Sequence, residues 1–348
     1  MSKKINVLVV DDSALVRKIL REGLAEDPEI EVIGTASDPF QARDMIKQLN
    51  PDVLTLDVEM PRMDGVEFLR RMMPVRPMPV IMVSSLTDRG AQITMDALDA
   101  GALDFVTKPS TDVKRGLELL IYQLREKVKI ASKASVKRTK PRMEVTVDKP
   151  KLPTSALDST TDKVIAIGAS TGGTEAIKEV ITKFPVNTPG VVIVQHMPPG
   201  FTKMFSQRLN TLCQMDVKEA EDGDRVMRGR ILIAPGGMQM KVVRVGGVYR
   251  VKIEKGDLVC GHMPSVEVLF DSVAENVGKN AIGVILTGMG KDGAGGMLNM
   301  KNSGAFTIAQ DKSSCVVFGM PMEAFKLGGV EKLLPLSKIA DEVKKNIL

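Results

Sequence analysis

Apolar and amphipathic segments alternate five times through the first 126 residues of the chain. Each apolar run is short and rich in β-branched residues, which predicts a buried strand, and each following segment has apolar residues at helical spacing. Repeated strand–helix units predict a parallel sheet with helices on both faces. The predicted strands are Ile5–Val10, Glu31–Ala36, Val53–Asp57, Val80–Ser84 and Ala102–Thr107, and the helices begin near Ser13, Pro39, Gly65, Gly90 and Asp112.

This alternation fades after residue 126 and returns at residue 163. The residues between are rich in lysine, serine and proline, which predicts a linker, although the fifth helix can extend to about Ile130. Beyond it, continuous apolar runs with glycine-rich loops and helical segments predict a doubly wound α/β domain with a mostly parallel sheet. We therefore expect a first domain, a linker and a second domain at residues 1–126, 127–162 and 163–348.

Length and composition limit the class of protein. The chain has 348 residues, of which 43% are hydrophobic, and no run approaches the ~20 apolar residues of a membrane span. The N-terminus runs directly into a predicted strand, without the pattern of a signal peptide. Three widely spaced cysteines fit a reducing compartment better than a disulfide framework. We expect a cytoplasmic protein that does not insert into membranes and acts as a monomer.

Charge is unevenly distributed along the chain. Residues 1–126 carry 16 basic and 21 acidic residues, whereas residues 163–348 carry 23 and 18, giving net charges of −5 and +5. The linker adds another +5, so it is either a solvated tether or a segment attracted to the acidic first domain. With two tyrosines, no tryptophan and no recognisable reading helix, the chain does not favour nucleic acid binding.

Polar side chains follow the predicted strands of the first domain. Asp11, Asp12, Asp57, Ser84 and Lys108 all come at carboxyl ends of strands, which meet at one edge of a parallel sheet. Clustered carboxylates suit Mg²⁺, and a carboxylate can also accept a phosphoryl group as an aspartyl phosphate. The lysine and the hydroxyl could then bind the phosphoryl oxygens. Each aspartate alone could simply end a strand or cap a helix.

The set as a whole resembles the receiver domain of bacterial response regulators, which has a flavodoxin-like fold. The motifs that carry the resemblance are Asp11-Asp12, the run from Asp57 to Gly65, Ser84 and Thr107-Lys108-Pro109. The resemblance implies that Asp57 is phosphorylated by a histidine kinase and that the Glu59 carbonyl completes the Mg²⁺ site. Phe105 stands where such domains place a switching aromatic, and it can equally be a core residue.

The stretch from Val164 to Gly173 places a serine between a strand and a helix. Gly168-Ala169-Ser170-Thr171-Gly172 fits G-x-S-x-G, in which a sharp turn exposes the serine hydroxyl and the glycines leave room for a base and a substrate. A glycine turn or a phosphate-binding loop of a doubly wound fold fits the same letters.

Two further strand ends supply a base and a carboxylate. His196 ends the run from Val191, and Asp292 lies in the glycine-rich loop after Val284–Leu286, so both could converge with Ser170 at one sheet edge. His196 would accept the serine proton, Asp292 would orient it, and backbone groups at Met289 and Thr171 could hold the oxyanion. His262 is the rival base, although its place before a helix favours a substrate-side or structural role. A structural histidine, a turn or a nucleotide loop are the alternatives.

Long ordered motifs in this second domain are similar to the chemotaxis methylesterase (CheB) family. They are Ile167–Gly173, Gln195–Phe201, Pro264–Val266, Leu286–Gly293 and Ser314–Pro321. The resemblance implies hydrolysis of glutamyl methyl esters and deamidation of glutamines on chemoreceptors, which would be the protein partners. It implies Ser170 as nucleophile, His196 as base, Asp292 as its partner and the Met289 N–H as an oxyanion donor. No cofactor is expected for ester hydrolysis.

Two other classes of function compete with this hydrolase. One is a phosphorylation-switched module that holds a nucleotide without catalysis, and the other is a receiver-linked transcription factor. The chain has no G-x-x-x-x-G-K-[ST] motif and no helix-turn-helix signature, which weighs against both. For the hydrolase, we expect the unphosphorylated first domain to cover the Ser170 edge and block a bulky substrate.

Overall fold

The computed structural model describes residues 3–85, 87–109, 113–134 and 163–347. It divides the chain into two compact units, residues 1–143 and 144–348, each of which is described by itself. The fifth helix ends at Ala131 and the next described strand begins at Val164. Most of the expected linker, from residue 135 to residue 162, lies outside the described residues.

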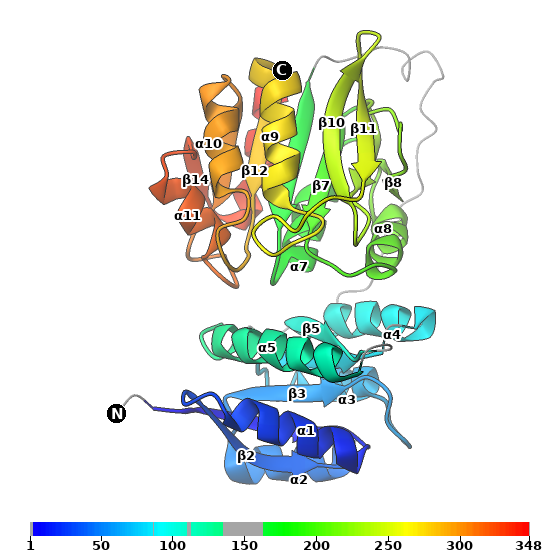
Figure 1. Ribbon diagram of the computed structural model, residues 1–348, viewed down its shortest axis with the longest axis vertical. Helices are drawn as coiled ribbons and strands as arrows, with labels where there is room; N and C mark the ends of the chain where they lie inside the picture. Colours follow the sequence, from blue (N-terminus) through cyan, green and yellow to red (C-terminus); the bar gives the residue numbers. More distant parts are fainter. Residues whose placement is uncertain (1–2, 86, 110–112, 135–162, 348) are drawn as a thin grey trace. The chain divides into compact units, whose positions relative to one another are not determined.

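The first unit is a parallel sheet in the order β2-β1-β3-β4-β5 (Figure 1). Alternate side chains of its central strands are buried on both faces, as expected for a sheet covered by helices on each side. Its strands are β1 Ile5–Val10, β2 Ile30–Ala36, β3 Val53–Asp57, β4 Val80–Ser84 and β5 Asp104–Thr107. The fold class predicted for this unit is confirmed.

Helices of the first unit begin where the sequence places capping residues. Ser13, Asp38, Asp64 and Thr87 each accept a hydrogen bond from a backbone N–H in the first turn of the helix that follows. Helices α1 and α5 pack with the sheet in one hydrophobic cluster. The helices are α1 Ala14–Ala25, α2 Pro39–Leu49, α3 Gly65–Met72, α4 Asp88–Asp99 and α5 Val113–Ala131.

The second unit has a parallel sheet in the order β14-β13-β12-β6-β7-β9-β8 within the described residues. The central strands β12, β6 and β7 are fully buried, which matches their continuous apolar sequence. The strands are β6 Val164–Ala169, β7 Gly190–Gln195, β8 Asp216–Glu219, β9 Arg230–Ile233, β12 Ala281–Ile285, β13 Phe306–Gln310 and β14 Lys332–Leu334. The doubly wound, mostly parallel fold is confirmed.

A two-stranded antiparallel hairpin is the exception to the parallel pattern. Strands β10 (Gln239–Val245) and β11 (Val248–Glu254) pair through a Gly246-Gly247 turn, and β10 packs against helix α9 (Val266–Asn276) (Figure 1). This hairpin was not among the predicted elements. The other helices are α7 Gly173–Ile181, α8 Phe201–Leu212, α10 Ala294–Asn302, α11 Met320–Lys326 and α12 Leu336–Ile347, with a 3₁₀ turn at Gly278–Asn280.

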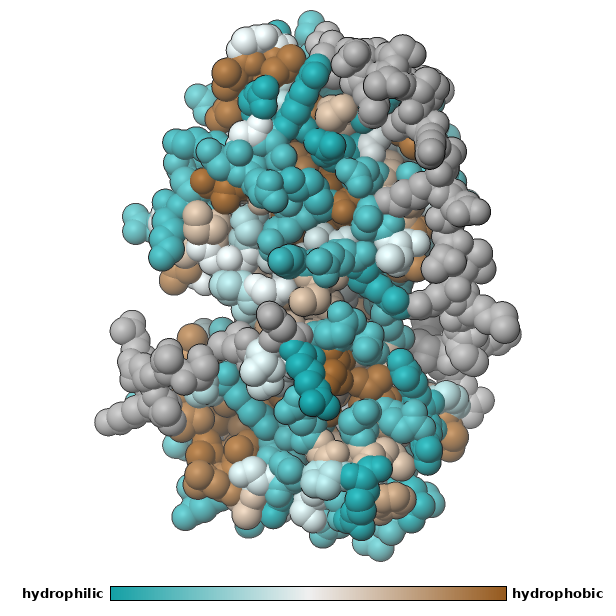
Figure 2. Space-filling view, turned by 90° about the vertical axis from the view of Figure 1, so that its right-hand side faces the viewer, coloured by the Kyte–Doolittle hydropathy of each residue, from teal (hydrophilic) through white to brown (hydrophobic). Residues whose placement is uncertain are grey.

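Figure 2 shows hydrophilic residues covering most of one face, with apolar residues in small patches between them. Among the residues described, no helix combines the length and the apolar character needed to span a bilayer.

Candidate active site

Ser170 lies immediately after β6, at the start of a tight turn into α7. Its backbone N–H donates to the Thr287 carbonyl at 3.0 Å, and its own carbonyl accepts from Gly173 N at 2.7 Å. Gly172 has a φ of 75°, a conformation that favours glycine. A Cβ on Gly168 would lie 2.2 Å from Val266 Cγ1, so this glycine makes room for helix α9 rather than for a base or substrate.

The loop after β12 lies directly against Ser170. A Cβ on Gly288 would come within 2.8 Å of the Ser170 Cβ, so only glycine permits this approach. Met289 follows Gly288 in that loop, and Thr171 follows Ser170 in the turn. Of the two residues named as sources of oxyanion N–H groups, Thr171 lies in the Ser170 turn and Met289 lies next to Gly288, which contacts Ser170. Thr171 is buried, and its carbonyl accepts from Thr287 Oγ1 at 3.1 Å.

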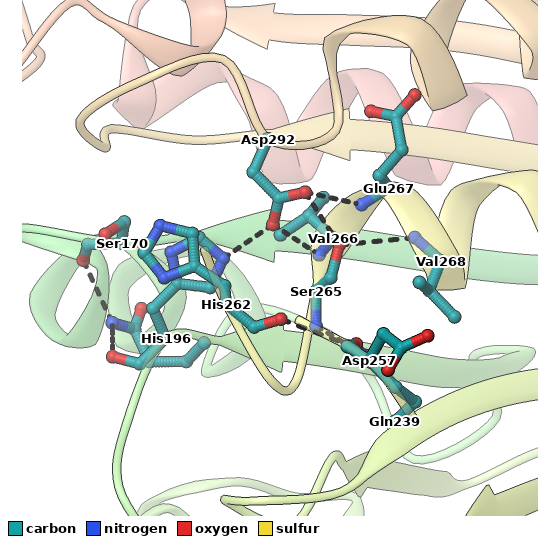
Figure 3. A network of polar contacts seen from close by, with 11 residues as sticks. Ser170, His196, Gln239, Asp257, His262, Ser265, Val266, Glu267, Val268 and Asp292 are labelled. Carbon is teal, nitrogen blue, oxygen red and sulfur yellow. Dashed lines mark hydrogen bonds and ion pairs between the residues drawn. The ribbon is translucent and has the colours of Figure 1, made fainter. Parts of the chain in front are cut away.

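His196 and Asp292 form a buried pair. His196 Nε2 lies 2.7 Å from Asp292 Oδ2, and their side chains are 7% and 1% exposed. The acceptor oxygen requires that Nε2 carry the proton, which leaves Nδ1 as the acceptor nitrogen. Nδ1 is buried and has no hydrogen-bond partner among the described residues. In Figure 3 Ser170 and Asp292 lie on opposite sides of the stacked imidazole rings of His196 and His262, so the three predicted residues lie at one site.

Three donors besides His196 fix the Asp292 carboxylate. The Ser265 hydroxyl donates to Oδ1 at 2.7 Å, and the first amides of α9 donate from Val266 to Oδ2 at 2.7 Å and from Glu267 to Oδ1 at 3.1 Å. Burial pushes the pKa of Asp292 upward, but the hydrogen bonds from His196, Ser265 and Val266 hold the pKa below its ordinary value. Asp292 is therefore a fixed anion at a helix N-terminus.

Helices α9 and α10 cap each other. Asp292, two residues before α10, accepts from the first turn of α9, and Glu267, in the first turn of α9, accepts from the Gly293 and Gly296 amides at the start of α10. Burial and the charges of Asp271 and Asp292 raise the pKa of Glu267. We call this arrangement the reciprocal cap. It fixes the Asp292 loop relative to α9.

His262 stacks on His196. Their ring centroids are 3.7 Å apart and the rings are inclined by 14° (Figure 3). His262 lies on the loop between β11 and α9. The role predicted for His262 was substrate-side or structural. In the structure its ring contacts His196, the candidate base.

In the first unit, Asp11, Asp12 and Asp57 form an acidic cluster whose ligand oxygens all lie within 4.8 Å of one another. Lys108 Nζ lies 2.9 Å from Asp11 Oδ2 and 3.0 Å from Asp57 Oδ2. Burial and the Asp11 charge raise the pKa of Asp57 to about 6, in spite of Lys108. An oxygen-only cluster whose charges still repel one another fits a divalent cation such as Mg²⁺.

The other residues predicted at the site of the first unit differ in exposure. Ser84 is fully buried, with its Oγ 2.6 Å from Thr94 Oγ1 and 3.2 Å from the Gly90 carbonyl oxygen. Glu59 is exposed, and its backbone hydrogen bond to the Asp57 carboxylate opposes the rise in pKa. Phe105 is 6% exposed, so in this structure it is a core residue.

Several residues that support the second site were given no supporting role by the sequence prediction. Ser265 and Glu267 support Asp292 and the loop around it, and Gln195 Nε2 donates to the Ser170 carbonyl at 2.9 Å. The Ser-Val-Glu sequence before an apolar helical run is a helix-start signal, which could have placed Ser265 at an N-cap. No sequence signal connects that cap to Asp292.

Comparisons with known proteins identify the families to which the two units are similar. Residues 165–343 match the family described as CheB methylesterase, and residues 7–118 match the response regulator receiver domain. A relative from Syntrophotalea carbinolica is 61% identical over 99% of this chain and 98% of its own length, and one from Salmonella typhimurium is 53% identical over 99% and 97%. Both are named protein-glutamate methylesterase/protein-glutamine glutaminase. The crystal structure of the Thermotoga maritima CheB methylesterase catalytic domain is 40% identical and covers 54% of this chain and 100% of its own, with a TM-score of 0.53.

Proposed function

The chain belongs to the CheB methylesterase family and is a carboxylic ester hydrolase, and we propose that Ser170, His196 and Asp292 carry out its reaction. The substrates are methyl esters of glutamate side chains on methylated chemoreceptors, and certain receptor glutamines, which are deamidated at the same serine. The family relationship favours this function over a nucleotide-holding module or a transcription factor.

One observation carries the proposal. His196 Nε2 is bonded to a buried, ionised Asp292, so the base has one defined tautomer with Nδ1 left to accept a proton. In Figure 3 Ser170 lies on the other side of the stacked histidine rings from Asp292. A hydroxyl, a correctly protonated imidazole and an orienting carboxylate are the three parts that nucleophilic ester hydrolysis requires.

The reaction follows from these positions. The Ser170 proton passes to His196 Nδ1 while Oγ bonds to the ester carbonyl carbon, and the carbonyl oxygen becomes an oxyanion held by the Met289 and Thr171 N–H groups. The intermediate then collapses, the C–O bond to methoxide breaks, and His196 returns the proton so that methanol leaves. Water, deprotonated by the same nitrogen, hydrolyses the acyl-enzyme to a glutamate carboxylate and free Ser170.

The direct test is Ser170→Ala. We expect methanol release from methylated receptor membranes to fall by a factor on the order of 10³ or more, because no other group forms the acyl-enzyme. A fluorophosphonate probe should label the wild-type chain and not the variant. Ser314→Ala is a matched control in the same unit, at a serine that caps a turn with Asp311. Near-normal methanol release by Ser170→Ala would refute the assignment.

The first unit would control this reaction by phosphorylation of Asp57. Asp11, Asp12, Asp57 and the Glu59 carbonyl would hold Mg²⁺, which when bound neutralises charge during phosphoryl transfer. A histidine kinase would supply the phosphoryl group, and Lys108 and Ser84 would contact its oxygens. Because the Ser84 hydroxyl is buried against Gly90 and Thr94, it has to rotate to do so.

The division into residues 1–126, 127–162 and 163–348 also belongs to the proposal, with the unphosphorylated receiver restraining the catalytic part. A tether of this length keeps two domains at high effective concentration, so a weak contact is enough. A fragment starting near Ser159, in the part that the structure does not describe, should release methanol faster than the unphosphorylated whole chain and ignore phosphodonors. A folded fragment that is no faster would rule out restraint by occlusion.

A further inference from the structure

The two histidines of the chain form a face-to-face pair at the candidate active site. The ring of His262 covers one face of the His196 ring, with centroids 3.7 Å apart and an angle of 14° between the planes. The contact joins the end of β7 to the loop before α9, two segments that are 66 residues apart in the sequence.

This contact controls the orientation of the plane of the His196 ring. The hydrogen bond to Asp292 fixes one ring atom, Nε2, but leaves the ring able to turn about that atom. The χ2 torsion of histidine is broad, so rotamer preference does not define the plane. A proton can pass from Ser170 only if Nδ1 points toward Oγ within hydrogen-bond reach. A flat partner on one ring face restricts the turning and so favours this orientation.

The backbone of His262 is itself held firmly. His262 N donates to the Val259 carbonyl at 2.9 Å, and Val259 N donates to the His262 carbonyl at 3.1 Å. Gln239 of β10, which is buried, fastens the loop with Nε2 3.0 Å from the Asp257 carbonyl oxygen and 3.4 Å from that of His262. Its Oε1 accepts from Ser265 N at 2.8 Å.

The same short segment also holds the carboxylate. Residues 257–266, which we call the clamp segment, supply the His262 ring to the face of His196 and the Ser265 hydroxyl and Val266 amide to Asp292. Base and orienting carboxylate are thus positioned against one piece of backbone. A movement of the clamp segment would change both together.

We propose that His262 is a positioning residue for His196, acting through the flat surface of its ring and not through its own proton chemistry. The inference rests on the proposed roles of Ser170, His196 and Asp292 and adds to them a second support for the base. Planar side chains in close stacked contact attract one another through dispersion, which requires neither a charge nor a shared proton. An aromatic hydrocarbon ring at position 262 should therefore serve nearly as well as imidazole.

The test compares His262→Ala with His262→Phe in the full-length chain. We expect His262→Ala to lower kcat for methanol release, and the rate at which a fluorophosphonate labels Ser170, by about tenfold or more, because misplaced reacting groups are costly. His262→Phe should keep both rates within about threefold of wild type, since it retains the stacked surface. His262→Tyr provides a second aromatic variant, and thermal unfolding shows which variants are folded.

Leu327→Ala is the matched control, because Leu327 lies in the second unit outside the clamp segment and is 53% exposed. It should leave both rates unchanged. Folded aromatic variants as slow as His262→Ala would overturn the proposal and assign proton chemistry to His262. Equal rates for His262→Ala and wild type would remove His262 from the site altogether. Both outcomes can be distinguished from failure of the proposed function. If the proposed function were wrong, the fluorophosphonate would not label Ser170 even in the wild-type chain.

Discussion

Asp57 ends a parallel strand and Asp292 lies in the loop after another, and both are buried, yet their pKa values shift in opposite directions. Burial raises the pKa of each. Asp292 receives a ring N–H, a hydroxyl and two helix amides, which outweigh burial. Asp57 shares Lys108 with Asp11, whose negative charge adds to the effect of burial.

The difference indicates what each carboxylate is built for. Asp292 has its partners within the folded chain, so it is an ion of fixed position that orients a base. Asp57 is left with excess negative charge around it, which a divalent cation and a phosphorylation reaction can use. A buried carboxylate with complete partners favours a supporting role, and one without them favours a reacting role.

The largest test of this comparison is Asp292→Ala. The variant leaves the Ser265 hydroxyl, the Val266 and Glu267 amides and His196 without their acceptor. We expect kcat for methanol release to fall by about 10⁴. The unfolding free energy of the second unit should fall by about 3 kcal/mol, since buried donors lose their partner. Methanol assays and calorimetry of the full chain measure both effects.

Asp271→Ala is the control for that variant, because Asp271 is an exposed carboxylate of α9 that accepts from Asn299. It should change the rate and the stability only slightly. If Asp292→Ala kept more than a tenth of the wild-type rate, Asp292 would not be the residue that orients the base.

Asp57→Asn should change the unfolding free energy less than Asp292→Ala does, and in the opposite direction. It removes the acyl phosphate acceptor, so no radiolabel should enter from a phosphodonor with Mg²⁺. It also removes a carboxyl group whose pKa is raised to about 6. Without Mg²⁺ the variant's first unit should therefore be stabilised by about 1 to 3 kcal/mol at pH 7. Mg²⁺ should stabilise the wild-type first unit and not this variant. Label retained by Asp57→Asn would place the phosphoryl group on another residue.

The smallest expected effect is a difference in how the contributions of Asp57 and Asp292 to stability depend on pH. Calorimetry without metal measures it. Because the folded pKa of Asp57 is above its unfolded value of 3.8, its contribution to stability is full below pH ~4 and is lost as the pH rises toward about 6. The folded pKa of Asp292 is below 3.8, so its contribution is present above pH ~4 and is lost as the pH falls through the folded value. Asp57→Asn and Asp292→Ala identify which transition belongs to which unit. Parallel pH profiles of the two transitions would contradict the comparison.

Much of the fold could be predicted because each strand is a local pattern. The expected and observed bounds of β1, β3 and β4 coincide, and Ser13 and Pro39 stand at the expected helix starts. Strand β5 begins two residues later than expected, at Asp104, and Ala102 and Leu103 belong to the connection between α4 and the strand. The β10–β11 hairpin was missed, although alternating residues around Gly246-Gly247 are a recognised hairpin signal.

The sequence predicted only those site residues that stand at strand ends or in the loops directly after them. Ser170, His196 and Asp292 follow three adjacent strands of a parallel sheet, so their meeting is a consequence of topology. The stack of His262 on His196 and the donation of Ser265 to Asp292 depend on how the β11–α9 loop packs. Nothing in the spacing of residues 257–266 encodes that packing. The role of Gly168 was misjudged for the same reason, since Val266 approaches it from a distant segment.

The reciprocal cap has a consequence for motion in the native state. The first amides of α9 are protected by a carboxylate that precedes α10, and the first amides of α10 by a carboxylate of α9. Opening of either helix start therefore removes hydrogen-bond partners from the other. Amide hydrogens at Val266, Glu267, Gly293 and Gly296 should therefore exchange with solvent deuterium at rates that reflect one shared opening event. Their exchange would report fraying of the catalytic loop as a single cooperative unit.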